Sequence, residues 1–174
     1  MYTDTILYVA SIEADLQVSW KTNKGRVQEY IRTSAGSSSD KPDRSWCGDF
    51  AYWVLKMAGV TPLPPVASCL KSGWNTVARF GQTYKKRTPG TYTAKPGDMY
   101  YMPKVRGHDG QLHETHHVGF VMDDSGGASF ESLDGNGKGG GNWAIMTANK
   151  IGGGYVSYAT RERNLVKYFI EMPD

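Results

Sequence analysis

The segment from Trp46 to Gly59 (WCGDFAYWVLKMAG) constrains the fold of this chain more strongly than any other part of the sequence. Its large apolar residues recur at the i, i+3, i+4 and i+7 positions that line one face of a helix: Phe50, Trp53, Val54 and Met57. Gly59 is a typical residue at a helix C-terminus, and the helix is expected to begin at or just after Cys47. The segment therefore predicts a helix that faces the core.

Helices are expected before this segment and strands after it. A first helix is predicted over residues 6–20, with its apolar residues at helical spacing: Ile6, Val9, Ile12, Leu16 and Trp20. A second, short helix ends near Gly36, and a modest third one covers residues 69–80. Alternating segments beyond Lys95 predict strands at 99–102, 117–122, 128–133, 155–158 and 166–170. Helices followed by an antiparallel sheet indicate an α+β fold.

Length and charge narrow the class of protein. The chain has 174 residues, which suits a single domain over 1–174. A net charge of +3 is too small to argue for a nucleic-acid partner. No apolar run approaches the roughly 20 residues of a spanning helix, and no basic and apolar leader is visible. We expect a protein made in the cytoplasm without a cleaved signal peptide and without membrane insertion.

Cys47 is the first candidate for chemistry. A cysteine at the start of a helix lies near free backbone N–H groups and the positive end of the helix dipole, which favours the thiolate. The same N–H groups can stabilise an oxyanion if the thiolate attacks a carbonyl. The alternative is a buried structural cysteine, which is the reading we give to Cys69 because it lacks this context. Two cysteines are too few for a disulfide-stapled scaffold.

A reactive cysteine needs a base, and all four histidines lie between His108 and His117. His117 opens an expected strand, on the same face as Gly119 and Val121, so it can be aimed at a helix N-terminus packed across the sheet. The alternative is a hydrogen-bonded structural histidine.

A third group must orient the imidazole, as in any catalytic triad. Asp134 ends the expected strand that follows the one carrying His117, and a hairpin would bring the two residues side by side. Asn136 can take or share this role, and Glu131 is a weaker candidate. The alternative for Asp134-Gly135-Asn136 is an ordinary turn.

Four motifs in this order resemble the CHAP family (cysteine, histidine-dependent amidohydrolases/peptidases) of the papain-like clan of peptidoglycan hydrolases: WCGDFAYWVLKMAGV, KPGDMYYM, HHVGFVMDD and FESLDGNG. The resemblance covers residues 18–137 and implies a papain-like fold in which the nucleophile helix packs on an antiparallel sheet. It further implies Cys47 as nucleophile, His117 as base, Asp134 as the orienting acid and Asn136 in support. The family usually has Glu where Asp134 stands, so either the shorter acid approaches more closely or Asn136 takes its role.

The resemblance also implies a function. We expect hydrolysis of an amide bond in the peptide part of peptidoglycan, as an N-acetylmuramoyl-L-alanine amidase or an endopeptidase, with no cofactor. Such catalytic units occur as type VI secretion effectors, which act in the periplasm of a target cell and imply a cognate immunity protein in the producer, or as phage lysins. The alternatives are a deamidase or acyltransferase that acts on proteins, and a catalytically silent binding module.

Other ligand signals are weaker. His113 and His116 lack the paired spacing of a zinc site, and Asp40, Asp43 and Asp49 lack the spacing of a calcium loop, so we predict no metal. Residues 135–140 (GNGKGG) match GxGxxG, but no helix pattern follows, which argues against a nucleotide site. Trp46 and Trp143 flank the expected site, and we expect both to contact substrate.

Overall fold

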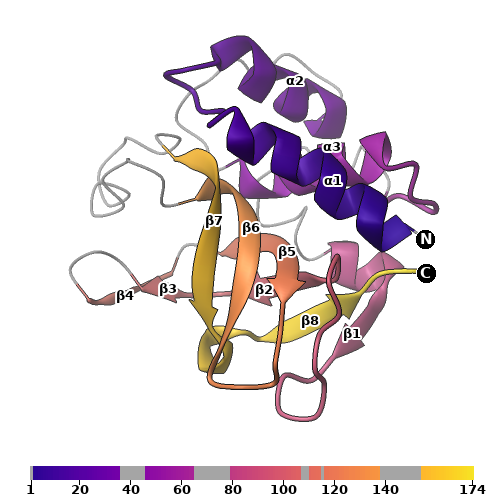
Figure 1. Ribbon diagram of the computed structural model, residues 1–174, viewed down its shortest axis with the longest axis vertical. Coiled ribbons are helices and arrows are strands. Elements are labelled where there is room, and N and C mark those ends of the chain that lie inside the picture. Colours follow the sequence, from indigo (N-terminus) through magenta and orange to yellow (C-terminus); the bar gives the residue numbers. More distant parts are fainter. Residues whose placement is uncertain (1, 36–45, 65–78, 107–109, 115, 138–153) are drawn as a thin grey trace.

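The helices of the chain gather on one side of a curved antiparallel sheet (Figure 1). The computed structural model describes residues 2–35, 46–64, 79–106, 110–114, 116–137 and 154–174. Helices α1, α2 and α3 span Tyr2–Asp15, Lys24–Ala35 and Cys47–Met57. The strands that follow are β1 (Lys85–Arg87), β2 (Met99–Met102), β3 (Val105–Arg106), β4 (Leu112–His113), β5 (His117–Asp123), β6 (Ser129–Gly137), β7 (Tyr155–Glu162) and β8 (Tyr168–Glu171).

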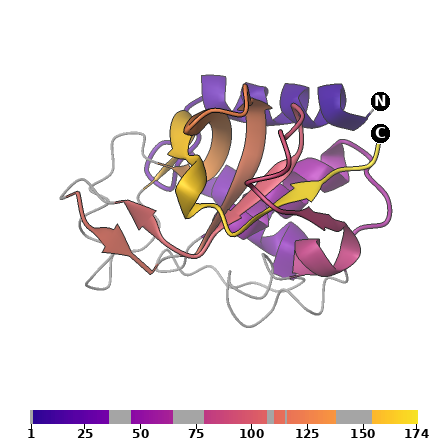
Figure 2. The ribbon, with the colours of Figure 1, turned by 90° about the horizontal axis from the view of Figure 1, so that it is seen from below.

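The main sheet has six strands in the order β1-β8-β2-β5-β6-β7, and every pairing is antiparallel. The strands β3 and β4 form a separate pair that projects away from the end of the molecule where both termini lie (Figures 1 and 2). This arrangement confirms the predicted α+β class, with N-terminal helices packed on an antiparallel sheet. Among the described residues, no helix is both long and apolar enough to cross a membrane.

Helix α3 forms as its sequence predicts and lies in the core between the other helices and the sheet. It begins at Cys47, and all of its residues up to Leu55 are buried. Gly59 adopts φ +73° just beyond the helix, a conformation that glycine accepts without steric cost. One detail of the prediction is wrong: Met57 is 47% exposed, because it belongs to the last turn of the helix.

Helix α1 differs from its prediction in length and in its buried face. It ends at Asp15, and Ile12 and Leu16 are exposed. Glu13 is buried instead, because Arg26 forms an ion pair with its carboxylate at 2.6 Å and the Tyr30 hydroxyl donates a hydrogen bond to it. A charged residue that is fully paired can occupy a core position, which an apolar pattern does not reveal.

Strand β6 is longer than expected, and this corrects the turn predicted at Asp134-Gly135-Asn136. The strand continues to Gly137, with an irregularity in its pairing to β7 between Asp134 and Gly137, where Asn136 adopts φ +56°. The expected strands at 99–102, 117–122 and 155–158 are present, the last one extended to Glu162. The pattern does not predict β1, β3 or β4, which have two or three residues each. Most of the helix predicted at 69–80 lies outside the described residues.

Gly135 brings β6 against α3, and its replacement is the first prediction. A Cβ atom at this position would overlap the side chain of Phe50, which is fully buried in α3. Gly135→Ala should therefore lower the free energy of unfolding by about 1–3 kcal/mol, measured by urea denaturation. Gly90→Ala is the control, because nothing lies within 4 Å of an added Cβ there. Equal stability of the two variants would contradict the close packing of β6 on α3.

Candidate active site

The register of four strands places a set of polar side chains on one face of the sheet. Tyr100 on β2 pairs with Gly119 on β5, and the β5–β6 register sets Gly119 opposite Asp134. On the other side of β6, Phe130 pairs with Arg161, so Arg161 projects from β7 on the face that Asp134 shares. His117 lies two residues before Gly119 and therefore on this face as well. The alternation predicted for His117 is confirmed.

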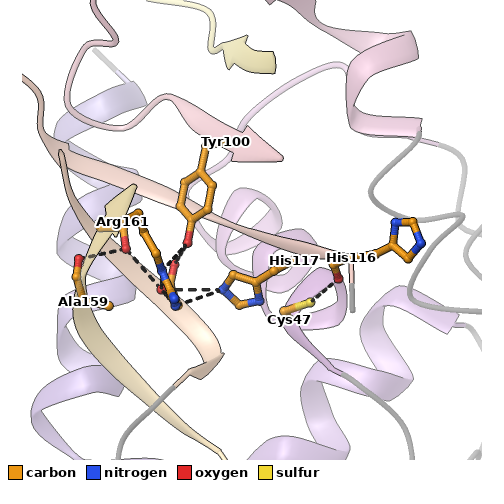
Figure 3. Close-up of polar contacts among 8 residues, drawn as sticks. Cys47, Tyr100, His116, His117, Ala159 and Arg161 are labelled. Carbon is orange, nitrogen blue, oxygen red and sulfur yellow. Dashed lines mark hydrogen bonds and ion pairs between the residues drawn. The ribbon is translucent and has the colours of Figure 1, made fainter. Parts of the chain in front are cut away.

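Cys47 stands at the N-terminus of α3 beside the start of β5. Its Sγ lies 3.8 Å from the backbone carbonyl oxygen of His116. Figure 3 shows Cys47 on the side of the His117 ring that is opposite Arg161. Since Nε2 of His117 is directed at the Asp134–Arg161 pair, Nδ1 is the ring nitrogen on the side of the sulfur. Cys47 and His117 are both almost fully buried, with exposed fractions of 1% and 2% for the whole residues.

The start of α3 suits a thiolate nucleophile. Trp46 is the N-cap residue and makes no side-chain capping bond, and the first intrahelical hydrogen bond runs from the amide of Phe50 to the carbonyl of Trp46. The amides of the first turn before Phe50 therefore have no acceptor within the helix. The positive end of the helix dipole lies at the same place. The sulfur and the backbone N–H groups that can stabilise an oxyanion are thus neighbours.

Asp134 is the most heavily coordinated side chain of the site. The Tyr100 hydroxyl donates to its Oδ1, and both Nε (2.9 Å) and Nη2 of Arg161 donate to its Oδ2. The Ser132 hydroxyl lies 3.1 Å from Oδ2 and 3.0 Å from the carbonyl oxygen of Ala159. Nε2 of His117 is 3.6 Å from Oδ2, which is an ion-pair distance and not a hydrogen bond. The carboxylate is therefore fixed first by Arg161 and Tyr100 (Figure 3).

These contacts shift the pKa of both partners in directions that favour an ion pair. Burial disfavours the charged imidazole of His117, but the Asp134 charge and the contact with Cys47 outweigh it, so its pKa is raised above the usual value. Burial likewise disfavours the Asp134 carboxylate, yet the charges of Arg161 and His117 hold its pKa well below the usual range. Asp134 is thus ionised at neutral pH, beside an imidazole that readily holds a proton.

The other predicted residues have contacts of their own. Asn136 is buried, and its Oδ1 accepts a hydrogen bond from the amide of Gly154 at 3.3 Å. Trp46 is fully buried and its ring lies 5.9 Å from that of Tyr30, so it is a core residue and does not line an open groove, contrary to expectation. Trp143, the second predicted substrate contact, lies outside the described residues. Glu131 bonds to Thr160 on the exposed part of β6.

Within the part of the chain that the structure describes, no three His, Cys, Asp or Glu side chains gather as metal ligands. Asp49 is buried, and Ser34 donates a hydrogen bond to its carboxylate. His116 contacts the Tyr101 hydroxyl through Nδ1 at 2.6 Å. Asp40 and Asp43 lie outside the described residues.

Arg161 and the role of Tyr100 beside Asp134 are the features that sequence reasoning missed. Arg161 follows Asp134 by 27 residues and carries no local motif. Its only sequence signal is a charged residue within an alternating segment, which is indistinguishable from a solvent-facing strand position.

Comparison with known proteins agrees with this geometry. A family profile described as the CHAP domain matches residues 39–136, more than half of the chain. The chain belongs to the CHAP family. Cys47, His117, Asp134 and Asn136 fall within the matched CHAP segment, whereas Arg161 lies beyond it. CHAP domains are amidases or peptidases that act on peptidoglycan.

Solved structures and curated proteins add little to the CHAP assignment. The crystal structure of a wild-type endolysin, LysIME-EF1, is similar at 15% sequence identity and a TM-score of 0.42, over 86% of this chain and 64% of that chain. The chain thus covers less than two thirds of that endolysin. No curated protein gives a significant match.

Gly119 allows Asp134 to reach its position, which gives the second prediction. A Cβ atom on Gly119 would overlap Oδ1 of Asp134 and lie 2.9 Å from the Tyr100 hydroxyl. Gly119→Ala should displace the carboxylate from His117 and lower kcat for peptidoglycan hydrolysis by about 10-fold or more. Gly127→Ala is the control, since its added Cβ would meet the Ser125 hydroxyl at an ordinary 3.6 Å. Full activity of Gly119→Ala would show that the position of Asp134 does not matter.

Proposed function

We propose that this chain hydrolyses an amide bond in the peptide part of peptidoglycan by a thiol mechanism. The observation that carries the proposal is the order of three groups across the site: the Cys47 sulfur at a helix N-terminus, the His117 ring beside it, and the ionised Asp134 at the far ring nitrogen. A catalytically silent relative would have no reason to keep a buried, charge-paired imidazole next to a cysteine. Membership of the CHAP family supplies the substrate class.

Each protonation step has a residue in place. Nδ1 of His117 takes the proton of the Cys47 thiol, and the thiolate attacks the amide carbonyl carbon to form a tetrahedral oxyanion. Backbone N–H groups of the first turn of α3 donate hydrogen bonds to that oxyanion. The imidazolium gives its proton to the leaving amine as the C–N bond breaks, and a thioester remains. Water, deprotonated by His117, then attacks the thioester and releases the acid and the free thiol.

The proposed mechanism and the CHAP family also suggest which kinds of bond are cut and which residues assist. The mechanism serves an N-acetylmuramoyl-L-alanine amidase and an endopeptidase equally, because the first cleaves the amide between sugar and alanine and the second an amide within the stem or cross-link. Asp134 acts as the orienting acid, and Asn136 supports the site through the backbone at Gly154. Delivery as a secreted effector with an immunity partner, or as a phage lysin, stays a prediction.

Digestion of purified peptidoglycan tests the proposed function directly. We expect new soluble fragments whose masses identify the bond that is cut, and a new amine for each bond. Cys47→Ala should reduce the rate by about three orders of magnitude or more, because the proposed acyl intermediate forms on this sulfur. Cys69→Ala is the matched control and should keep the activity. Undiminished cleavage by Cys47→Ala would remove the nucleophile from the mechanism.

Alkylation by iodoacetamide tests whether His117 activates the sulfur. At about pH 6 a free thiol is almost wholly protonated, whereas a thiolate paired with an imidazolium reacts. We expect Cys47 to be alkylated at least about 10-fold faster in the wild type than in His117→Gln, with mass spectrometry reporting the site. Glutamine is no larger than histidine and does not block the reagent, so a slower reaction in the variant reports lost activation. Equal rates would leave Cys47 as an ordinary buried cysteine.

A further inference from the structure

Arg161 is a buried charge whose contacts converge on the catalytic pair. Its side chain is 7% exposed, it forms a fork on Oδ2 of Asp134, and its Nη2 lies 3.4 Å from Nε2 of His117. Its Nε also donates to the Tyr100 oxygen at 3.1 Å. The guanidinium therefore places its positive charge next to both the carboxylate and the imidazole of the proposed catalytic pair.

The distance between Asp134 and His117 explains why such a residue is needed. Oδ2 of Asp134 lies 3.6 Å from Nε2 of His117, an ion-pair distance that is too long for a directional hydrogen bond. The orientation of the carboxylate must therefore be set by other donors. Arg161 and Tyr100 supply three of the donors that fix it, from β7 and β2 on either side.

We propose that Arg161 is a positioning residue of the active site: it holds the Asp134 carboxylate towards Nε2 of His117, and its positive charge offsets the pull of that carboxylate on the imidazole proton. The inference deepens the proposed function and rests on it. It assigns a role to a residue beyond the segment that the CHAP profile matches.

The offset matters because His117 must both take and release a proton. Among the described residues, the ionisable groups around its ring include Cys47 from α3, Asp134 from β6, Arg161 from β7 and Tyr100 from β2. Cys47 as thiolate and Asp134 both stabilise the imidazolium, and Tyr100 is neutral because burial and the Asp134 charge raise its pKa far above the usual value. Arg161 is then the one positive group in this set of neighbours, so its removal should strengthen the hold on the proton.

Histidine NMR titration and hydrolysis kinetics test the proposal together. The His117 signal is identified as the one missing from His117→Gln. In Arg161→Gln we expect His117 to titrate about one pH unit higher than in the wild type, and kcat to fall about 10-fold or more with KM little changed. Arg161→Lys keeps the charge but not the fork, so kcat should fall while the titration stays near that of the wild type.

Arg163→Gln is the matched control. Arg163 lies two residues further along, pairs with the buried Asp124, and donates to the backbone carbonyl of Gly127 at 2.7 Å. Its loss should reduce stability but leave both the His117 titration and kcat unchanged. A titration in Arg161→Gln identical to that of the wild type, with only stability lowered, would reduce Arg161 to a structural residue and overturn the proposal.

Arg161→Lys decides the question if Arg161→Gln does not fold, because it keeps a positive charge in the site but cannot form the fork on Asp134. A kcat in Arg161→Lys equal to that of the wild type would overturn the proposal. The titration needs no substrate: a wild type that cleaves no peptidoglycan contradicts the proposed function, while the His117 shift still decides the role of Arg161.

Discussion

The buried carboxylate of Asp134 is the constraint on which the rest of the site depends. A charge with no exposure to water costs several kcal/mol unless it is paired and hydrogen-bonded. The chain meets this requirement with donors from three strands, namely Tyr100 on β2, Ser132 on β6 itself and Arg161 on β7, and with the missing side chain of Gly119 on β5. The relative positions of four strands are therefore coupled to the position of one acid, and the imidazole of His117 is placed by the same framework.

Two sequence motifs that look like ordinary turns, at Asp98 and at Gly135, help to hold the fold together. Asp98 of the Pro-Gly-Asp turn is buried, and its carboxylate accepts hydrogen bonds from the Tyr92 hydroxyl and from the amides of Lys95 and Met172. It thereby ties the start of β2 to the end of the chain. Gly135, which looks like part of a turn, lets β6 touch α3. The helix that carries the sulfur and the strand that carries the acid are consequently in direct contact.

Sequence reasoning succeeds where a signal is periodic and local. The buried face of α3 and the alternation of β5 follow from spacing, so Cys47 and His117 could be placed at the start of their elements. Sequence reasoning fails where a partner that is distant in the sequence determines whether a residue is buried. Glu13 is buried because Arg26 pairs with it, while Ile12 and Leu16 of the expected apolar face are exposed.

The sequence does not reveal the role of Arg161 for the same reason, because only the β6–β7 register shows that it lies beside Asp134. The irregularity in β6 likewise has no periodic signature, and a strand that bends at Asn136 reads as a turn. Trp46 is predicted to contact substrate only because it precedes Cys47. A residue next to a nucleophile need not face the substrate when the start of the helix is itself buried.

The two adjacent histidines show that the surroundings, and not the residue type, make the base. His116 adopts φ +45°, and its ring stacks on Tyr101 at an interplanar angle of 9°. Burial, and the charge of Lys167, lower its pKa although Glu114 opposes them, whereas the pKa of His117 is raised. At neutral pH His116 is thus the neutral ring, and it meets Cys47 through its backbone carbonyl. The left-handed turn at His116 sends the two rings to different environments, so that only His117 lies between a cysteine and an ionised acid.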